Sequence, residues 1–137
     1  MIVYLDTSAL AKRYIIEPDA ESMNRLIAQN QGRLFTSIVT YAEILSVFAR
    51  CWRQRRISSR QFRAQNRAFL AEWSALHVVD LSFQVIQPAG RVIERHRLRA
   101  YDAVQLCSAL WLGRPVFATF DARLRQAAAA EGLPVTP

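Results

Sequence analysis

Short apolar runs alternate along the chain with longer amphipathic stretches, and this alternation limits the folds that the chain can adopt. The apolar runs of strand length fall at residues 2–5, 34–36, 77–81, 115–120 and 134–136. Between most of them, apolar residues recur every three or four positions, which is the spacing of a helix with one buried face. Strands that alternate with helices form a parallel sheet covered on both sides. We therefore expect a single α/β domain over residues 1–137, with a central, mainly parallel sheet of four to five strands.

The helical patterns predict where the layers around that sheet come from. They fall at residues 8–16, 19–30, 39–55, 59–76, 82–97, 101–113 and 121–131. The third and fourth of these are long, and Ile57-Ser58-Ser59 interrupts the pattern between them and supplies a new helix cap. Pro88 falls early in the fifth, where a proline is tolerated only in the first turn.

The charge of the chain favours a polyanionic partner. Eighteen basic residues against eleven acidic residues give a formal net charge of +7, and all but one of the basic residues are arginine. Arginine binds phosphates bidentately, and neutralised phosphates release counterions. No apolar run approaches the roughly 20 residues that cross a bilayer, and a secretory signal is not recognisable. We expect a cytoplasmic protein without a membrane segment, with Cys51 and Cys107 as buried free thiols.

Four acidic residues stand at helix starts. Asp6 and Asp121 follow apolar strands, Glu43 lies early in the helix after the second strand, and Asp102 opens the helix at 101–113. Each has an ordinary structural interpretation. Asp6 and Asp121 suit helix caps, Glu43 completes a capping box with Thr40, and Asp102 offsets the helix dipole.

A second interpretation is compatible with the first, because helix N-termini and the carboxyl ends of parallel strands lie at the same edge of a sheet. Carboxylates gathered there repel one another unless a divalent cation neutralises them. Oxygen ligands without a nearby histidine or cysteine favour Mg²⁺ or Mn²⁺ over zinc. The chemistry that uses such a site is phosphoryl transfer.

Four segments of the chain resemble the PIN-domain ribonucleases and, within them, the VapC-type toxins of toxin–antitoxin modules. They read VYLDTSALAKRYIIEP, TSIVTYAEILSVFAR, LRAYDAVQLCSAL and VFATFDARLRQAA, and together they span nearly the whole chain. The resemblance implies a PIN-like three-layer α/β/α sandwich with a protruding pair of long helices. It places the catalytic, metal-binding acids of the family on Asp6, Glu43, Asp102 and Asp121.

The resemblance also implies an activity and partners. The chain would be an Mg²⁺- or Mn²⁺-dependent endoribonuclease that hydrolyses RNA phosphodiester bonds. It would form a homodimer, and a cognate VapB-type antitoxin would neutralise it. Ser8 and Thr119 stand beside the acids, where their hydroxyls would bond a carboxylate or a metal-bound water. Both residues serve equally well as an ordinary helix-cap and a strand-end hydroxyl.

Arginines recur every three or four residues across the two long helices, at Arg53, Arg56, Arg60, Arg63 and Arg67. This spacing fits a ridge that contacts RNA, and it fits a solvated helix face equally well. Large apolar side chains are also more numerous than a small core hides. We expect some of them to line a subunit or antitoxin surface: Tyr41, Phe48, Trp52, Trp73 and Trp111.

Two other function classes remain open. A non-catalytic RNA- or partner-binding module would keep the acids only as caps. A phosphatase or phospho-acceptor domain would also place an aspartate after the first strand. That class expects a second acid where Ser8 stands, or a lysine on a late strand, whereas Lys12 is the only lysine.

The remaining titratable residues are assigned no catalytic role. Asp80 closes a strand but matches no acid of the family, and Glu17, Asp19 and Glu21 suit a helix N-terminus. His77 and His96 are expected at the surface.

Overall fold

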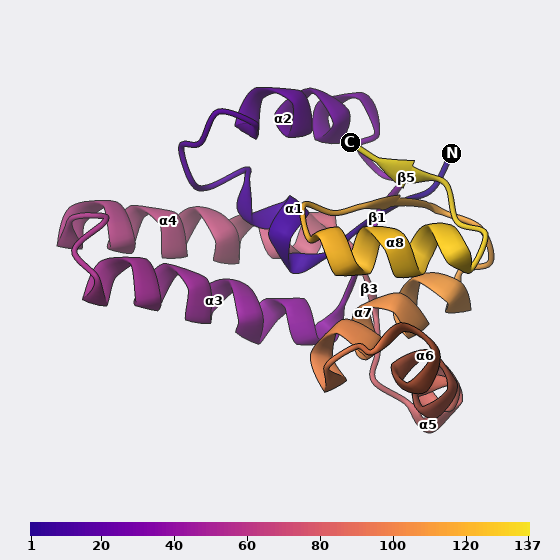
Figure 1. The fold of residues 1–137 in the computed structure, drawn as a ribbon. Helices are drawn as coiled ribbons and strands as arrows, with labels where there is room; N and C mark the ends of the chain where they lie inside the picture. The colour runs from indigo at the N-terminus through magenta and orange to yellow at the C-terminus, as the bar shows by residue number, and fades with distance from the viewer.

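The computed structural model describes residues 1–137 and contains a five-stranded sheet between layers of helices (Figure 1). The strands are β1 (Val3–Leu5), β2 (Leu34–Ser37), β3 (His77–Val79), β4 (Val116–Ala118) and β5 (Val135–Thr136). Their order is β3-β2-β1-β4-β5, and every neighbouring pair is parallel. The three-layer α/β/α fold with a parallel sheet is therefore confirmed.

Eight α-helices surround the sheet, and two of them reach well beyond it. The helices are α1 (Thr7–Ala11), α2 (Ala20–Gln29), α3 (Ile38–Arg53), α4 (Ser59–Glu72), α5 (Phe83–Ile86), α6 (Ala89–His96), α7 (Ala100–Trp111) and α8 (Ala122–Ala130). A single 3₁₀ turn, Trp73–Ala75, follows α4. Figure 1 shows α3 and α4 side by side, extending to the left of the sheet as the expected protruding pair.

The sheet separates two hydrophobic cores, because successive side chains of a strand point to opposite faces. In β1, Val3 and Leu5 belong to the core that α1, α2, α3 and α4 cover. Tyr4 points the other way, into the core that α6, α7 and α8 cover. Asp6 directly follows β1, so the central position of β1 places Asp6 at the middle of the carboxyl edge of the sheet.

Aromatic rings fill the space between the helical pair and the sheet. Phe48 is fully buried, and its ring lies 6.1 Å from that of Phe69. Tyr41 and Trp73 pack around Phe69 at ring distances of 5.8 Å and 5.5 Å. Three of the five side chains considered for a partner surface are thus largely used inside the protein, and Trp52 and Trp111 are the two that stay exposed.

Three local predictions are wrong at their boundaries. The helix expected at 8–16 ends at Ala11, after which the chain tightens into i to i+3 bonds such as Arg13 N to Leu10 O. The helix expected at 82–97 is split, because Pro88 cannot donate a hydrogen bond and instead precedes the first residue of α6. Ser37, not Thr40, caps α3; Thr40 is buried and bonds Thr36, so no Thr40–Glu43 capping box forms.

Other predictions hold. Ser58 caps α4 in a capping box with Gln61, and Ser82 caps α5. Cys51 and Cys107 are free and buried. None of the helices has the length and apolar character that a membrane crossing requires.

Candidate active site

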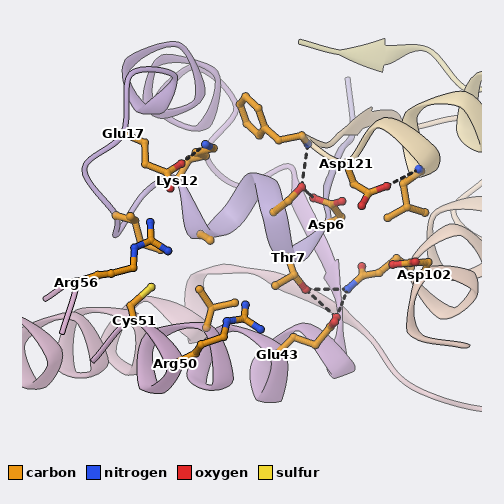
Figure 2. Close-up of a pocket in the computed structure, with 17 residues that line it drawn as sticks. Asp6, Thr7, Lys12, Glu17, Glu43, Arg50, Cys51, Arg56, Asp102 and Asp121 are labelled. Atoms are coloured by element: carbon orange, nitrogen blue, oxygen red, sulfur yellow. Dashed lines mark hydrogen bonds and ion pairs between the residues drawn. The ribbon is translucent and has the colours of Figure 1, made fainter. Parts of the chain in front are cut away.

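A pocket of about 470 Å³ lies at the carboxyl ends of the central strands, and all four predicted acids line it (Figure 2). Each carboxylate comes from the beginning of a different helix. Asp6 and Asp121 are the N-caps of α1 and α8, Asp102 lies in the first turn of α7, and Glu43 lies in the second turn of α3. The parallel sheet therefore gathers residues that lie far apart in the sequence.

Asp6 is the most enclosed of the four acids, with 2% of its surface exposed. Its Oδ1 accepts hydrogen bonds from the Ala9 amide at 2.8 Å and from the Ser8 hydroxyl at 2.7 Å. Its Oδ2 accepts one from the Thr119 hydroxyl at 2.5 Å. Burial raises the pKa of Asp6 to about 6, and these donors limit the rise. The hydrogen bonds thus hold the Asp6 carboxyl group in one orientation, while its burial favours the protonated form more than water does.

The same two hydroxyls hold the segment that carries Asp121. The Phe120 amide donates to the Ser8 hydroxyl at 2.8 Å, and the Asp121 amide donates to the Thr119 hydroxyl at 3.0 Å. The Asp121 carboxylate caps α8 by accepting from the Leu124 amide at 2.8 Å. The residue is exposed, so one of its oxygens faces the pocket. Ser8 and Thr119 therefore link the ends of β1 and β4.

A buried polar network fixes Glu43. Its Oε1 accepts from the Thr7 hydroxyl at 2.8 Å and lies 2.9 Å from Gln105 Nε2 (Figure 2). Gln105 is 2% exposed and also reaches the Thr40 hydroxyl at 2.9 Å, while its Oε1 accepts from the Tyr4 hydroxyl at 2.6 Å. The network joins α7, α3 and β1 behind the carboxylate.

Negative charge accumulates on this side of the pocket. The pKa of Asp102 is raised, first by burial and then by the charges of Asp121 and Glu43; Arg99 and Arg123 oppose the shift. The charge of Asp121 also contributes to the raised pKa of Asp6. The negative charges of the acids therefore repel one another across the pocket, and a bound cation would relieve this repulsion.

The acids share a pocket without forming a closed cage. No three of the aspartate, glutamate, histidine and cysteine side chains converge as tightly as a ready-made metal cluster does. The acids on this wall stand among hydroxyl and amide side chains, with no histidine in the pocket, and carboxylate oxygens are the ligands that Mg²⁺ and Mn²⁺ accept, usually together with waters. By the chemistry of its donors, the site fits such an ion.

The opposite wall of the pocket is basic. Figure 2 shows Lys12 and Arg56 across the cavity from Asp6, Asp102 and Asp121, and it shows Arg50 beside Glu43 on α3. Lys12 forms an ion pair with Glu17, and its ammonium group lies 4.6 Å from the centre of the Phe120 ring. Glu17 was expected to compensate a helix N-terminus and instead holds this lysine at the pocket.

The five predicted ridge arginines are all exposed, and none forms an ion pair. Only Arg56 among them lines the pocket; the others lie along the protruding helices. His77 is exposed as expected. The surface assignment of His96 is wrong, because its side chain is 9% exposed and lies 3.6 Å from Glu131.

Several residues of the site were missed in the sequence. Thr7 and Gln105 hold Glu43, and Lys12 and Arg50 form the basic wall. Gln105 carried a detectable signal, because it lies one helical turn after Asp102 and interrupts the otherwise apolar stretch AVQLCSAL. Arg50 carried none, because its spacing is the same as that of the other arginines on the long helices.

Comparison with known proteins agrees with this geometry. The PIN domain family model matches residues 3–130. Ribonuclease VapC45 of Mycobacterium tuberculosis (strain CDC 1551 / Oshkosh) is 32% identical over 138 aligned positions, covering 99% of this chain and 95% of the relative.

Solved structures share the fold at lower identity. VapC20 of Mycobacterium tuberculosis, described as a toxin that cleaves the sarcin-ricin loop, is 21% identical with a TM-score of 0.68, covering 96% of this chain and 95% of that chain. DNA-bound VapBC of Salmonella typhimurium is 18% identical with a TM-score of 0.70, covering 99% and 97%. On the family model and the full-length relative, the chain belongs to the PIN domain family and is a relative of the VapC ribonucleases.

Proposed function

We propose that the protein is a cytoplasmic endoribonuclease toxin that hydrolyses RNA phosphodiester bonds with Mg²⁺ or Mn²⁺ at the acidic wall of the pocket. The observation that carries this proposal is the division of one cavity into an acidic wall and a basic wall. The acidic wall suits a divalent cation, and the basic wall suits the phosphates of the substrate. The relationship to VapC ribonucleases points to the same activity.

Asp6, Glu43, Asp102 and Asp121 would hold the ion. When bound, Mg²⁺ or Mn²⁺ supplies an activated water and stabilises charge on the scissile phosphate and its leaving oxygen. The side chains around the acids have a separate task. Ser8 and Thr119 orient Asp6, and Thr7 and Gln105 orient Glu43, so both carboxylates are positioned before the ion binds.

The basic wall would bind and orient the RNA. Arg50 and Arg56 are exposed, face the cavity and have no carboxylate partner, so their guanidinium groups are free to donate hydrogen bonds to phosphates. Lys12 is tied to Glu17 and borders the same cavity. A phosphodiester placed between the walls would therefore meet cationic groups on one side and the ion site on the other.

Cleavage of purified total RNA tests the proposal directly. The wild-type protein is compared with Asp6→Asn in Mn²⁺, in Mg²⁺ and in EDTA. Asparagine caps a helix as well as aspartate does, so the variant should fold normally. Discrete fragments that need the metal and disappear in the variant are expected. Intact RNA in every lane, from folded wild-type protein, would overturn the proposal.

The alternative of a non-catalytic binding module has one observation in its favour, because Asp6 and Asp121 do cap helices. The two functions differ in their response to metal. An ion that binds only the folded protein must raise its melting temperature. We expect Mn²⁺ to stabilise the wild-type protein, and to stabilise Asp6→Asn and Asp102→Asn much less; equal melting curves with and without Mn²⁺ would favour the binding module.

We also propose a VapB-type antitoxin partner, which VapBC complexes among the structural neighbours support, and a homodimer, which the resemblance to the VapC-type toxins implies. A second hollow adjoins the acidic pocket, and Glu43 and Arg50 line both. The apolar lining of this second hollow comes from Val39, Val47, Leu81 and Tyr101. Leu81 and Tyr101 are 50% and 63% exposed. A partner chain covering these side chains would also close the acidic pocket, which would explain neutralisation.

Two measurements test these partners. Light scattering should give twice the 15.6 kDa mass of one chain, and a monomer mass at all concentrations would contradict the homodimer. Co-purification with a co-expressed VapB-type antitoxin should be lost in Leu81→Asp. Retention of the partner by that variant would place the antitoxin elsewhere.

A further inference from the structure

The charged side chains of the protruding helical pair are almost all positive. Between Glu43 and Glu72 the chain has no acidic residue and seven arginines. All seven are exposed, and none forms an ion pair. They are Arg50, Arg53, Arg55, Arg56, Arg60, Arg63 and Arg67. Helix surfaces that only need solvation usually mix both signs, so this surface is built for a polyanion.

At the tip of the pair, a tryptophan is fixed in place while part of its ring stays open. Trp52 stacks on Phe62 at 4.7 Å between ring centres and 9° between planes, and its indole nitrogen donates to the Ser59 hydroxyl at 3.1 Å. These contacts occupy one ring face and the polar edge, yet 42% of the residue is exposed. The ring also lines a hollow of about 630 Å³ together with Arg53, Arg55 and Arg56.

The backbone at the tip is held in a conformation that disfavours arginine. The Arg56 amide donates a hydrogen bond to Cys51 O at 2.9 Å, and the Arg55 amide donates one to Trp52 O at 3.0 Å. This pair of hydrogen bonds is the Schellman motif of a helix C-terminus. This motif places Arg55 at a φ of 57°, where glycine is the favoured residue. Arg55 therefore occupies this position at a cost in backbone strain that a glycine would avoid.

Arg56 connects the tip to the acidic pocket, because it lines both hollows. Arg50 lies between, on the pocket wall. An extended polyanion crossing the acids would thus pass Arg50 and Arg56 and reach the exposed part of Trp52. Aromatic rings beside arginines bind single-stranded nucleic acid, since any unpaired base stacks on the ring while the arginines neutralise the backbone.

We propose that the tip of the α3–α4 pair is a docking site for an unpaired base of the RNA substrate, with Trp52 as the stacking platform and Arg53 and Arg55 as phosphate contacts. The site rests on the proposed ribonuclease function and deepens it. It makes the enzyme select RNA that presents a single-stranded segment beside the scissile bond, such as a loop, because a base inside a duplex cannot reach the ring.

Binding of labelled RNA to the Asp6→Asn protein tests this without cleavage. A single-stranded RNA oligonucleotide is compared with a duplex of the same sequence. Trp52→Ala should weaken single-strand binding by about tenfold, the loss of one base–aromatic stack, and leave duplex binding unchanged. Trp52→Phe should retain most of the affinity. Trp111→Ala is the matched control, because Trp111 is 58% exposed but lies in none of these hollows.

Arg55→Gly separates binding from folding. Glycine suits the left-handed backbone, so this variant should melt at a higher temperature and yet bind both RNA probes more weakly, with a smaller dependence on salt. RNA affinity unchanged in both Trp52→Ala and Arg55→Gly would overturn the docking site and assign the tip to an acidic protein partner. Metal-dependent cleavage by the wild-type protein is measured separately, so failure of the ribonuclease proposal remains distinguishable.

Discussion

The hydroxyl of Thr119 donates a 2.5 Å hydrogen bond to Oδ2 of Asp6, joining residues 113 positions apart. The hydroxyl oxygen of Thr119 also accepts a hydrogen bond from the Asp121 amide at 3.0 Å. One side chain at the end of β4 therefore orients the most buried acid and holds the backbone of the acid beside it. In physical terms, the charge state of Asp6 and the position of Asp121 depend on a single hydroxyl.

Thr119→Val removes that hydroxyl and keeps the shape of the side chain. Burial raises the pKa of Asp6 to about 6 and Thr119 is the largest influence that lowers it, so the variant should have a higher pKa still. The acid limb of the pH–rate profile for RNA cleavage should move to higher pH. Thr119→Ser is the control that should keep the wild-type limb. Superimposable profiles for Thr119→Val and the wild type would show that Thr119 does not tune Asp6.

The raised pKa of Asp6 also predicts how folding stability depends on pH. The folded carboxyl titrates at about 6, above its ordinary value of 3.8. The folded state therefore binds more protons than the unfolded state in this window, and the contribution of Asp6 to stability is lost as pH rises from about 4 to about 6. Asp6→Asn removes the linkage, so in EDTA its melting temperature should gain on that of the wild type across this range. A constant difference between the two melting curves from pH 4 to pH 7 would contradict the shift.

Gln105 is expected to act through Glu43. Gln105→Leu fills a similar volume but removes the donor at 2.9 Å from Glu43 and leaves the Tyr4 hydroxyl without its acceptor. Loss of such a supporting contact typically lowers metal affinity or activity by about 10–100-fold. The orphaned hydroxyl should cost about 1–3 kcal/mol of stability.

The double variant Tyr4→Phe/Gln105→Leu distinguishes the two effects. It removes the orphaned hydroxyl together with its lost acceptor, so thermal melts should show partial recovery of stability. Cleavage rates should stay low, because Glu43 keeps the Thr7 hydroxyl but still lacks the Gln105 donor. Recovery of the cleavage rate along with stability would show that Gln105 serves only the fold.

The order and type of the elements could be read from the sequence, because the sheet is parallel and its strands are buried apolar runs between amphipathic helices. Boundaries failed where burial of a side chain or a single proline overrode the local spacing. Thr40 looked like a cap by its spacing, but its hydroxyl is taken by Thr36 inside the protein, and Ser37 caps α3. Pro88 was expected early in a single helix at 82–97 and instead divides α5 from α6.

The acids of the candidate site could be predicted from the sequence, but the residues that orient them could not. The four acids sit at helix starts, and the fold brings every such start to one edge, so their placement in one pocket follows from topology. The residues that orient them could not be found this way. Gln105 contacts Glu43 across 62 positions, and Arg50 has the same local spacing as arginines that do not line the cavity. Local sequence patterns carry no information about such contacts.

Arg50 should bind substrate without supporting the fold. It is exposed and has no ion-pair partner, so Arg50→Gln should change stability by no more than about 0.5 kcal/mol. One lost phosphate contact should raise KM and reduce the salt slope of RNA binding by about 0.7. Arg33→Gln, on an exposed residue before β2, is the matched control. Equal salt slopes for the two variants would remove Arg50 from the RNA path.

A cluster of basic residues around Glu131 offers the opposite case, a charged group that serves the fold and not the site. The Glu131 side chain is 6% exposed and lies 2.7 Å from Arg91, 3.3 Å from Arg95 and 3.6 Å from His96. Burial acts to raise the pKa of Glu131, but hydrogen bonds and charges from Arg91 and His96 outweigh it and leave the pKa below its usual value. The carboxylate thus ties α6 to the end of α8.

Glu131→Gln should lower stability at neutral pH by about 1–3 kcal/mol, because three basic groups lose the carboxylate charge and one of its two acceptor oxygens. Since the folded pKa is lowered, the contribution of Glu131 is present above the ordinary glutamate pKa and is lost as pH falls through about 4. The melting temperatures of the variant and the wild type should therefore converge in acid. At temperatures well below melting, the variant should cleave RNA with an unchanged kcat, because Glu131 lines none of the hollows near the acids. A fall in kcat without a fall in melting temperature would mean that the α6–α8 contact controls the active site instead of the fold.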